Sequence, residues 1–308
     1  MSRIKVSFVA DPDNYAKNQM QSLVDFCKYI PDFVQVPPKA ADILFVHNQQ
    51  YQRFEGRTCI VVEKADSSSL VFSRPFLNMD NVLGVFKHTL LRPMELQNTP
   101  FLFRRYHIAL LEDAYQLGEE KECLETVTRF DKLHCKVPMF MRWHTKNLFI
   151  PRKDVKKNND VVSRCNLQDI PHIQRHRSDA VRKVGGENKL LSKEGWADLL
   201  YRSKICVCPW GYGEMCYRDY EAMLSGCVMV KPNSDFIETW PDIYQNGVTY
   251  VACKHDLSDL NEVCQTVLDN YGDYKEMIER NHKVLREPNF DKMVAEFKEV
   301  LRSLGVVI

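Results

Sequence analysis

Short apolar runs alternate with amphipathic stretches along the whole chain. Runs rich in β-branched, aromatic or cysteine side chains predict buried strands at 4–10, 43–47, 59–63, 82–86, 160–165, 204–208, 227–230 and 249–253. Apolar residues at helical spacing predict helices at 18–29, 105–117, 119–130, 170–184, 271–285 and 290–301. Strands that alternate with helices at these lengths are typical of α/β proteins with parallel sheets. We therefore expect an α/β fold built from two Rossmann-like halves.

A charged segment separates the two halves. Residues 151–159 contain a proline, four basic residues and no apolar period, which is typical of a linker between domains. We expect a first domain at 1–150 and a second at 151–287. A final amphipathic helix is expected within 288–308, because Pro288 breaks the chain before it.

Composition changes this picture little. The 308 residues are 44% hydrophobic and 27% charged, with a net charge of +1, so no global field favours nucleic acid. The eleven cysteines are scattered, without a CxxC or HExxH motif, which predicts reduced thiols and no metal centre. No segment approaches the roughly 20 apolar residues of a membrane span. We expect a cytoplasmic protein without a membrane anchor.

The segment 203–235 is the best candidate for a ligand site. Its first strand ends at Pro209, which cannot donate a hydrogen bond to a sheet. Gly211 and Gly213 follow, and glycines permit close backbone approach or a positive φ. The turn is therefore suited to contact with a ligand.

A charged helix follows this turn. It is predicted to begin at Glu214 or Met215 and to end at Gly226. Its N-terminus would lie just past the carboxyl end of a parallel strand, where open α/β sheets bind ligands and where the helix dipole favours an anion. The alternative is a solvated helix face with local ion pairs, which the flanking glycines make less attractive.

These residues resemble a known family. The sequence PWGYGEMCYRDYEAMLSGCVMVKP, followed by TWPDIY and TYV, is similar to the donor-binding half of GT-B glycosyltransferases, closest to the exostosin-like group. The resemblance is strongest over 191–260. It implies two Rossmann-like domains around a cleft, an acceptor site in the first domain, a nucleotide-sugar site in the second, and a terminal helix that crosses back. It also implies a UDP-sugar donor and inversion at the sugar.

The resemblance assigns roles to individual residues of the second half. Glu221 would hold the donor ribose, and Arg218 and the turn at Gly213 would lie against the diphosphate or the sugar. An arginine of the preceding helix would contact the donor phosphates. The expected donor-site residues are Arg177, Arg182, Trp210, Gly211, Tyr212, Gly213, Glu214, Tyr217, Arg218 and Glu221.

The sequence itself restricts three of the roles that the resemblance suggests. Arg177 and Arg182 are five residues apart and do not share a helix face, so we expect only one to contact phosphate. Glu214 and Glu221 are one residue closer together than the paired glutamates of related retaining enzymes, so a retaining mechanism is not transferred. Trp240 either stacks on the nucleotide base or packs in the interior.

The catalytic base is expected in the first half. Asp11, His47 and Asp66 each follow a predicted strand end and would face the cleft, where an inverting transferase deprotonates the acceptor hydroxyl. A lone histidine or aspartate at such a position is more often a cap or turn residue, and Asp66 is the first candidate because the resemblance implies an acidic residue after the third strand. No DxD motif follows a strand of the donor half, so we expect no metal or other cofactor beyond the nucleotide-sugar cosubstrate.

Two other classes of protein were weighed against a glycosyltransferase. A dinucleotide-dependent enzyme would need a glycine-rich turn after the first strand, and residues 10–13 contain no glycine. A non-catalytic protein that binds nucleotide sugar or glycan would keep the pocket at Glu221 but lack a base. The sequence leaves this second alternative open.

Overall fold

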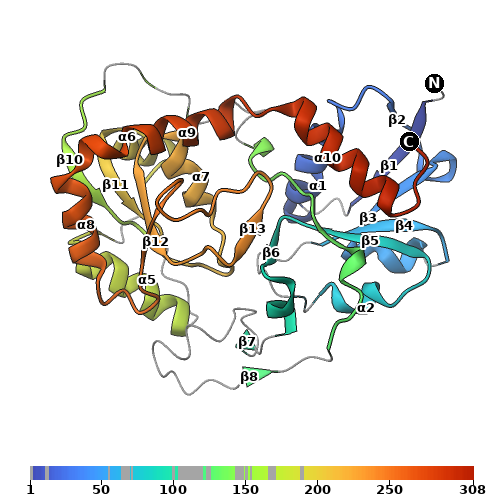
Figure 1. The fold of residues 1–308 in the computed structure, drawn as a ribbon, viewed down its shortest axis with the longest axis horizontal. Coiled ribbons are helices and arrows are strands. Elements are labelled where there is room, and N and C mark those ends of the chain that lie inside the picture. Colours follow the sequence, from blue (N-terminus) through green and yellow to red (C-terminus); the bar gives the residue numbers. More distant parts are fainter. Residues whose placement is uncertain are drawn as a thin grey trace.

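The computed structural model contains two parallel sheets that lie side by side, with helices around them (Figure 1). The structure describes residues 3–10, 14–54, 56–63, 70, 72–98, 101–102, 121–122, 126–142, 149, 152, 155–165, 171–187 and 191–308. Each sheet belongs to one half of the chain. The predicted α/β class is therefore confirmed.

The first half is built on a six-stranded parallel sheet in the order β2-β1-β3-β4-β5-β9. Its strands are β1 (Ile4–Val9), β2 (Phe33–Gln35), β3 (Ile43–His47), β4 (Cys59–Val62), β5 (Val82–Lys87) and β9 (Leu133–Cys135). Every residue of β3 and β4 is buried, as expected for central strands covered on both faces. The short half-exposed strand β2 was not predicted, because three residues carry too little pattern.

Short elements complete this half. They are α1 (Asn14–Cys27), α2 (Arg74–Leu77), β6 (Thr89–Leu91), β7 (Phe101–Leu102), β8 (Lys121–Glu122) and 3₁₀ turns at Pro38–Ala40, Asn48–Phe54, Met94–Asn98 and Phe130–Lys132. The helix predicted at 119–130 is wrong where the structure describes it, because β8 pairs with β7 and residues 126–129 are irregular. The helical spacing of the apolar residues in this stretch is overridden by the pairing of β8 with β7, a contact between segments distant in sequence. The helix predicted at 105–117 lies outside the described residues.

The second half is built on a four-stranded parallel sheet in the order β10-β11-β12-β14. Its strands are β10 (Asn159–Val162), β11 (Ser203–Val207), β12 (Val228–Pro232) and β14 (Val251–Cys253). Its helices are α5 (Pro171–Lys183), α6 (Lys193–Arg202), α7 (Tyr217–Leu224), α8 (Leu260–Asp269) and α9 (Lys275–Arg286), with a 3₁₀ turn at Tyr271–Tyr274. The side chain of Ser192 caps α6 by accepting a hydrogen bond from the Gly195 N–H at 3.1 Å.

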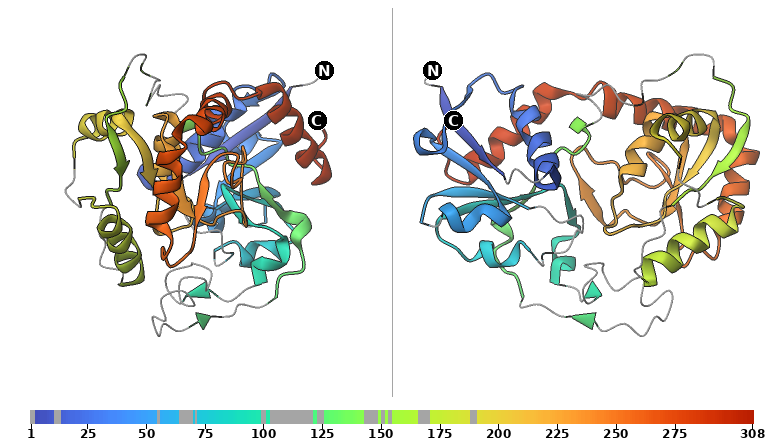
Figure 2. Two further views of the ribbon diagram at one scale, coloured as in Figure 1. Left: turned by 60° about the vertical axis from the view of Figure 1, so that its left-hand side comes forward. Right: turned by 180° about the vertical axis from the view of Figure 1, so that it is seen from behind.

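The last helix, α10 (Phe290–Ser303), packs on the first half. Figures 1 and 2 show it continuing the line of α9 from one half to the other, so that both chain termini lie at the same end. Phe297 is fully buried, with ring centroids 5.4 Å from Phe26, 5.6 Å from Phe86 and 6.1 Å from Trp240. The C-terminal helix thus connects the two halves. The domain boundaries stay a prediction.

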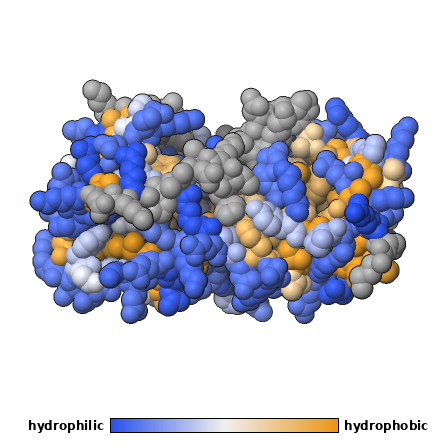
Figure 3. Space-filling view, turned by 90° about the horizontal axis from the view of Figure 1, so that it is seen from above, coloured by the Kyte–Doolittle hydropathy of each residue, from blue (hydrophilic) through white to orange (hydrophobic). Residues whose placement is uncertain are grey.

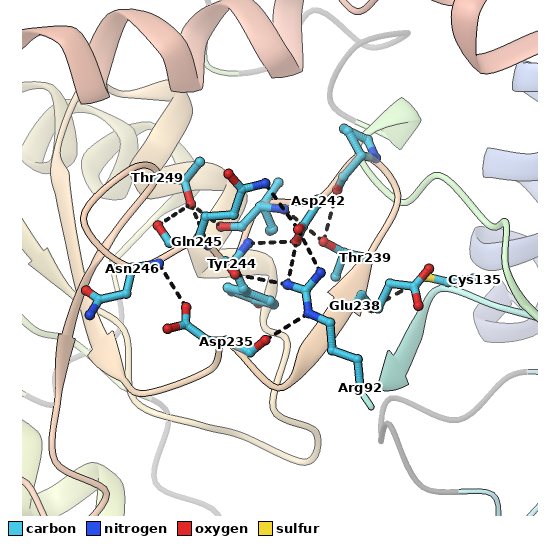
Figure 4. A network of polar contacts seen from close by, with 12 residues as sticks. Arg92, Cys135, Asp235, Glu238, Thr239, Asp242, Tyr244, Gln245, Asn246 and Thr249 are labelled. Atoms are coloured by element: carbon cyan, nitrogen blue, oxygen red, sulfur yellow. Dashed lines mark hydrogen bonds and ion pairs between the residues drawn. The ribbon is translucent and has the colours of Figure 1, made fainter. Parts of the chain in front are cut away.

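A second tie joins the halves near their middle. Strand β13 (Ile237–Thr239) pairs antiparallel with β6 of the first half. Beside it, Arg92 donates two hydrogen bonds to the carboxylate of Asp242, at 2.8 and 3.1 Å, and one to the Asp235 carbonyl at 2.8 Å (Figure 4). A bidentate arginine–carboxylate pair fixes orientation as well as distance. The two halves are therefore held in a defined relation.

The surface is mainly hydrophilic on the face seen from above (Figure 3). Within the part of the chain that the structure describes, no helix has both the length and the apolar composition needed to cross a bilayer.

Candidate functional site

A small pocket lies where the turn after β11 meets α7. Its volume is about 280 Å³, just below the usual range for ligand sites, so a whole nucleotide sugar would extend beyond it. The residues that line it are Arg177, Tyr212, Gly213, Met215, Cys216, Tyr217, Arg218 and Glu221. The pocket sits past the carboxyl end of a parallel strand, the position expected from the sequence. Six of the ten predicted donor-site residues line it.

Arg177 lines one side of this pocket, and Gly211 lies behind it. Arg177 comes from α5, is only 8% exposed, and donates from Nε to the Trp210 carbonyl at 3.1 Å. A Cβ on Gly211 would lie 2.2 Å from Nη2 of Arg177 and 3.0 Å from the Cys216 sulfur. Gly211 does not have a positive φ, so this glycine serves close approach alone.

Arg218 provides a second guanidinium in the pocket. Its Nη1 lies 3.5 Å from the Cys165 sulfur, and its guanidinium carbon lies 5.8 Å from the centre of the Trp196 ring. Its Nε is buried and has no hydrogen-bond partner among the described residues, and none of their carboxylates accepts from this side chain. A half-buried cation with spare donors is suited to bind an anion.

Glu221 is held in place by an indole. Its Oε2 accepts from Nε1 of Trp196 at 2.9 Å, and its other oxygen makes no hydrogen bond to the described residues. Burial raises the pKa of Glu221, against the opposing effects of the Trp196 hydrogen bond and of Arg218 and Arg142. The free oxygen is therefore available to a hydroxyl donor of a ligand.

Helix α7 begins later than predicted. Its first residue is Tyr217, and Cys216 is the N-cap. The Asp219 carboxylate turns back to accept from the Cys216 N–H at 3.0 Å, from the Tyr244 hydroxyl at 2.5 Å and from Lys231 at 3.1 Å. An internal acid thus already interacts with the positive end of the helix, so the arginines carry most of the pocket's attraction for anions.

Four predicted donor-site residues do not line the pocket. Trp210 is 1% exposed and donates from Nε1 to the Ser234 hydroxyl at 3.2 Å, and Glu214 is fully buried. Gly211 supports the wall from behind, as described above. Arg182 is largely exposed and pairs with Asp179 on its own helix at 2.9 Å. Of the two candidate arginines of α5, Arg177 alone reaches the pocket, as the five-residue spacing suggested.

Trp240 packs in the interior. Its ring is 7% exposed, lies 4.9 Å from the Phe26 ring, and donates from Nε1 to Glu296 of α10 at 2.8 Å. The interpretation as a base-stacking residue is therefore wrong. The tryptophan joins the last helix to the first half instead.

The structure describes one of the three candidate bases. Asp11 and Asp66 lie outside the described residues. His47 ends β3 with no exposed surface, and its Nδ1 accepts from the Gln49 N–H at 3.4 Å. His47 is therefore covered in this conformation, and its role stays a prediction.

Sequence reasoning missed a buried polar cluster at the same edge of the first sheet. Glu63, directly after β4, forms an ion pair with Lys87 at the end of β5, and both side chains are at most 1% exposed. Burial raises the pKa of Glu63, and burial with the charge of Lys87 lowers the pKa of His88 to about 3. Neither ring nitrogen of His88 has a partner among the described residues. The position of Glu63 and Lys87 at strand ends was the available signal.

A larger cavity among the described residues lies elsewhere. It has a volume of about 1060 Å³ and lies between the segment after β13 and the junction of α9 with α10. Its lining includes the Arg92–Asp242 pair and charged side chains of both signs from α9 and α10. It has no glycine turn, and its lining has six acidic and five basic side chains, so it carries no excess of positive charge for an anion. We place the ligand site at the smaller pocket for that reason.

The structure offers no evident metal centre in its described part, where no three histidine, cysteine or carboxylate side chains come together. The ten cysteines of this part are free thiols. Burial raises the pKa of most of these thiols, including that of Cys206.

The two parallel sheets and the returning helix constitute a GT-B fold. A solved glycosyltransferase from Rickettsia africae superposes with a TM-score of 0.52 over 98% of each chain, at 9% identity, a level that speaks for the fold alone. A protein of Arabidopsis thaliana described as a probable glycosyltransferase is 29% identical over 140 residues, which cover 44% of this chain and 27% of that protein. This chain thus matches about a quarter of that relative's length. No family model matches the chain.

Proposed function

We propose that this protein is a glycosyltransferase that moves a sugar from a nucleoside-diphosphate sugar to a hydroxyl of a glycan acceptor. The observation that carries the proposal is the pocket after β11, where Arg177 and Arg218 lie beside the carboxylate of Glu221. The GT-B fold and the similarity to a plant protein described as a probable glycosyltransferase support it. A UDP-sugar is the first donor to test, because the exostosin-like pattern implies it.

The residues of the pocket would divide the work of donor binding. Arg177 and Arg218 would bind the diphosphate and stabilise its charge as it leaves, the task that preorganised cations perform in group transfer. Glu221, oriented by Trp196, would accept from a ribose hydroxyl through its free oxygen. The close approach of Arg177 to Gly211 would fix the guanidinium before the donor arrives, which lowers the entropic cost of binding.

Acceptor activation would come from the first half. We propose inversion, with a base at the carboxyl edge of the first sheet, among Asp11, His47 and Asp66, and with Glu63 as a further candidate at that edge. We also propose that turnover needs no metal, because the arginines would neutralise the leaving group. Loss of transfer in EDTA, restored by manganese, would contradict this part of the proposal.

Thermal unfolding with UDP, GDP and their sugars tests the donor site directly. At about 100 times its dissociation constant a ligand adds about 2.7 kcal/mol of stability, which appears as a raised midpoint. We expect a UDP compound to stabilise the wild type and to lose this effect in Glu221→Ala, while Glu279→Ala, an exposed change on α9, keeps it. If no nucleotide raises the midpoint, the proposed function is wrong.

A transfer assay then separates an enzyme from a non-catalytic binding protein. Single replacements of Asp11, His47, Glu63 and Asp66 by alanine or the matching amide should leave donor stabilisation intact. A glycosyltransferase should lose turnover in one of these variants. Donor binding without turnover in the wild type, across a panel of glycan acceptors, would favour the binding protein.

A further inference from the structure

Arg142 of the first half contacts Tyr217, a residue that lines the pocket of the second half. Its guanidinium carbon lies 4.7 Å from the centre of the Tyr217 ring, and its Nη1 lies 3.4 Å from the Tyr217 hydroxyl. Tyr217 is the first residue of α7 and lines the pocket. The contact therefore joins the first half of the chain to the proposed donor site.

The backbone that carries Arg142 is well anchored. Met139, Phe140 and Met141 precede it and are at most 2% exposed. The guanidinium itself is only partly covered, and Arg142 has no carboxylate partner among the described residues. A guanidinium with spare N–H donors matches the geometry of a phosphate group. The guanidinium of Arg142 lies beside the pocket, because Tyr217 belongs to its lining.

The charges around the pocket agree with this interpretation. Two arginines and one carboxylate line it, which leaves one positive charge for a diphosphate that carries at least two negative charges. Arg142 adds another positive charge close enough to lower the pKa of Glu221. Among the described residues, the two negative charges of a nucleotide sugar's diphosphate are balanced when Arg142 of the first half is added to the charges of the pocket.

We propose that Arg142 is a binding residue for the diphosphate of the donor, supplied by the first half to the pocket of the second. This inference rests on the proposed function, since it assumes a nucleoside-diphosphate ligand. The donor pocket is then incomplete in the second half alone, and donor affinity depends on how the two halves are held. The Arg92–Asp242 pair and the β6–β13 pairing provide that relation.

The test compares Arg142→Met with a matched control. Arg152 lies 4.4 Å from the Tyr201 ring, an arginine–tyrosine contact of the same kind but away from the donor pocket. The dissociation constants of UDP, UMP and uridine are measured by calorimetry for the wild type, Arg142→Met and Arg152→Met. Unfolding midpoints without ligand show whether each variant is folded, and Arg142→Lys serves if the methionine variant is not.

We expect Arg142→Met to weaken UDP binding by about tenfold or more, because it removes hydrogen bonds between charged groups. Uridine binding should change less than about twofold, and Arg152→Met should bind all three ligands like the wild type. Equal UDP affinity in the wild type and Arg142→Met overturns the inference while leaving the proposed function intact. A wild type that binds no nucleotide overturns the proposed function itself.

A second pair of ligands separates the diphosphate from a sugar carboxylate. UDP-glucose and UDP-glucuronate differ in one anionic group on the sugar. A loss in Arg142→Met that is equal for both supports the diphosphate assignment. A loss confined to UDP-glucuronate, with UDP unaffected, overturns it.

Discussion

The contact between Gly211 and Arg177 shows how one residue can decide a site. The glycine-rich turn was evident in the sequence, yet its reason was open between a positive φ and close approach. The structure decides for close approach, because the guanidinium of Arg177 occupies the space of a Cβ. The partner comes from a helix 34 residues earlier in the chain, so no local pattern could reveal it.

Gly211→Ala should therefore impair donor binding more than stability. The methyl group would lie 2.2 Å from Nη2 of Arg177 and would displace the end of a flexible side chain. We expect UDP affinity to fall about tenfold or more, from the lost charge-assisted hydrogen bonds, when measured by calorimetry. Gly272→Ala is the control, because a Cβ there meets no atom within 4 Å. Unchanged UDP affinity in Gly211→Ala would argue against a role for Arg177.

Glu221 should make stability depend on pH. Burial raises its pKa in the folded state, so the folded protein binds this proton more readily than the unfolded chain. Its charged form therefore costs stability as the pH rises from about 4.5 through the raised pKa. We expect Glu221→Gln to have the higher unfolding midpoint at pH 7, and the difference to shrink towards pH 4.

The unfolding midpoint of a surface variant, measured over the same pH range, provides the comparison. Glu279→Gln changes an exposed carboxylate on α9 and should parallel the wild type at every pH. A Glu221→Gln curve that also runs parallel to the wild type from pH 4 to 8 would show that the Glu221 carboxyl is not perturbed.

At the scale of elements, the start of α7 is decided by a buried network. The sequence placed the helix start two or three residues too early, because Glu214 and Met215 fit a helix as well as a turn. Asp219, Lys231 and Tyr244 meet with no exposed surface, and the Asp219 carboxylate caps Cys216. The contacts of Asp219 with Lys231 in β12 and with Tyr244 in the loop after β13 fix where α7 begins. They thereby fix the positions of Arg218 and Glu221 on that helix.

Removing one member of this network should lower the free energy of unfolding. In Lys231→Met, the carboxylate of Asp219 would lose the ammonium that compensates its charge in the interior, a loss of about 3–5 kcal/mol in the free energy of unfolding. The double variant Lys231→Met, Asp219→Asn should recover part of this loss, because no unpaired charge remains. Urea denaturation measures both. A single variant within 1 kcal/mol of the wild type would mean that the ion pair adds little.

At the scale of the whole molecule, the last helix holds the two halves together. Phe297 contacts Phe26 and Phe86 of the first half and Trp240 of the second. Lys298 of the same helix pairs with Asp32. These contacts, together with the Arg92–Asp242 pair, set the distance at which Arg142 can reach Tyr217.

Phe297→Ala should destabilise the whole fold. Replacing a fully buried phenylalanine by alanine leaves a cavity and costs about 3–5 kcal/mol. Phe72→Ala, at a site 40% exposed, should change stability by less than about 0.5 kcal/mol. Guanidinium titration followed by tryptophan fluorescence measures both, and a Phe297→Ala variant as stable as Phe72→Ala would show that α10 is not part of the core.

The sequence by itself determined the α/β class, most strands and the location of the candidate site. Residues 43–47 form a strand with the predicted bounds, and the segment around Gly213, Arg218 and Glu221 lines a pocket. These features have local causes, since the burial of a strand or a helix face is written into its periodicity. The role of Trp240 was left open and the start of α7 was misjudged, because contacts with distant residues decide both.

Only the tertiary structure could bring Arg142 to Tyr217, 75 residues later in the chain. The same holds for the buried pair of Glu63 and Lys87 and for Arg177 behind Gly211. Each contact depends on how separate strands and halves pack, and packing is a property of the whole chain. The sequence therefore located the candidate pocket and named Arg177 and Arg218 for it, whereas the contact of Arg142 with this pocket was decided by the fold.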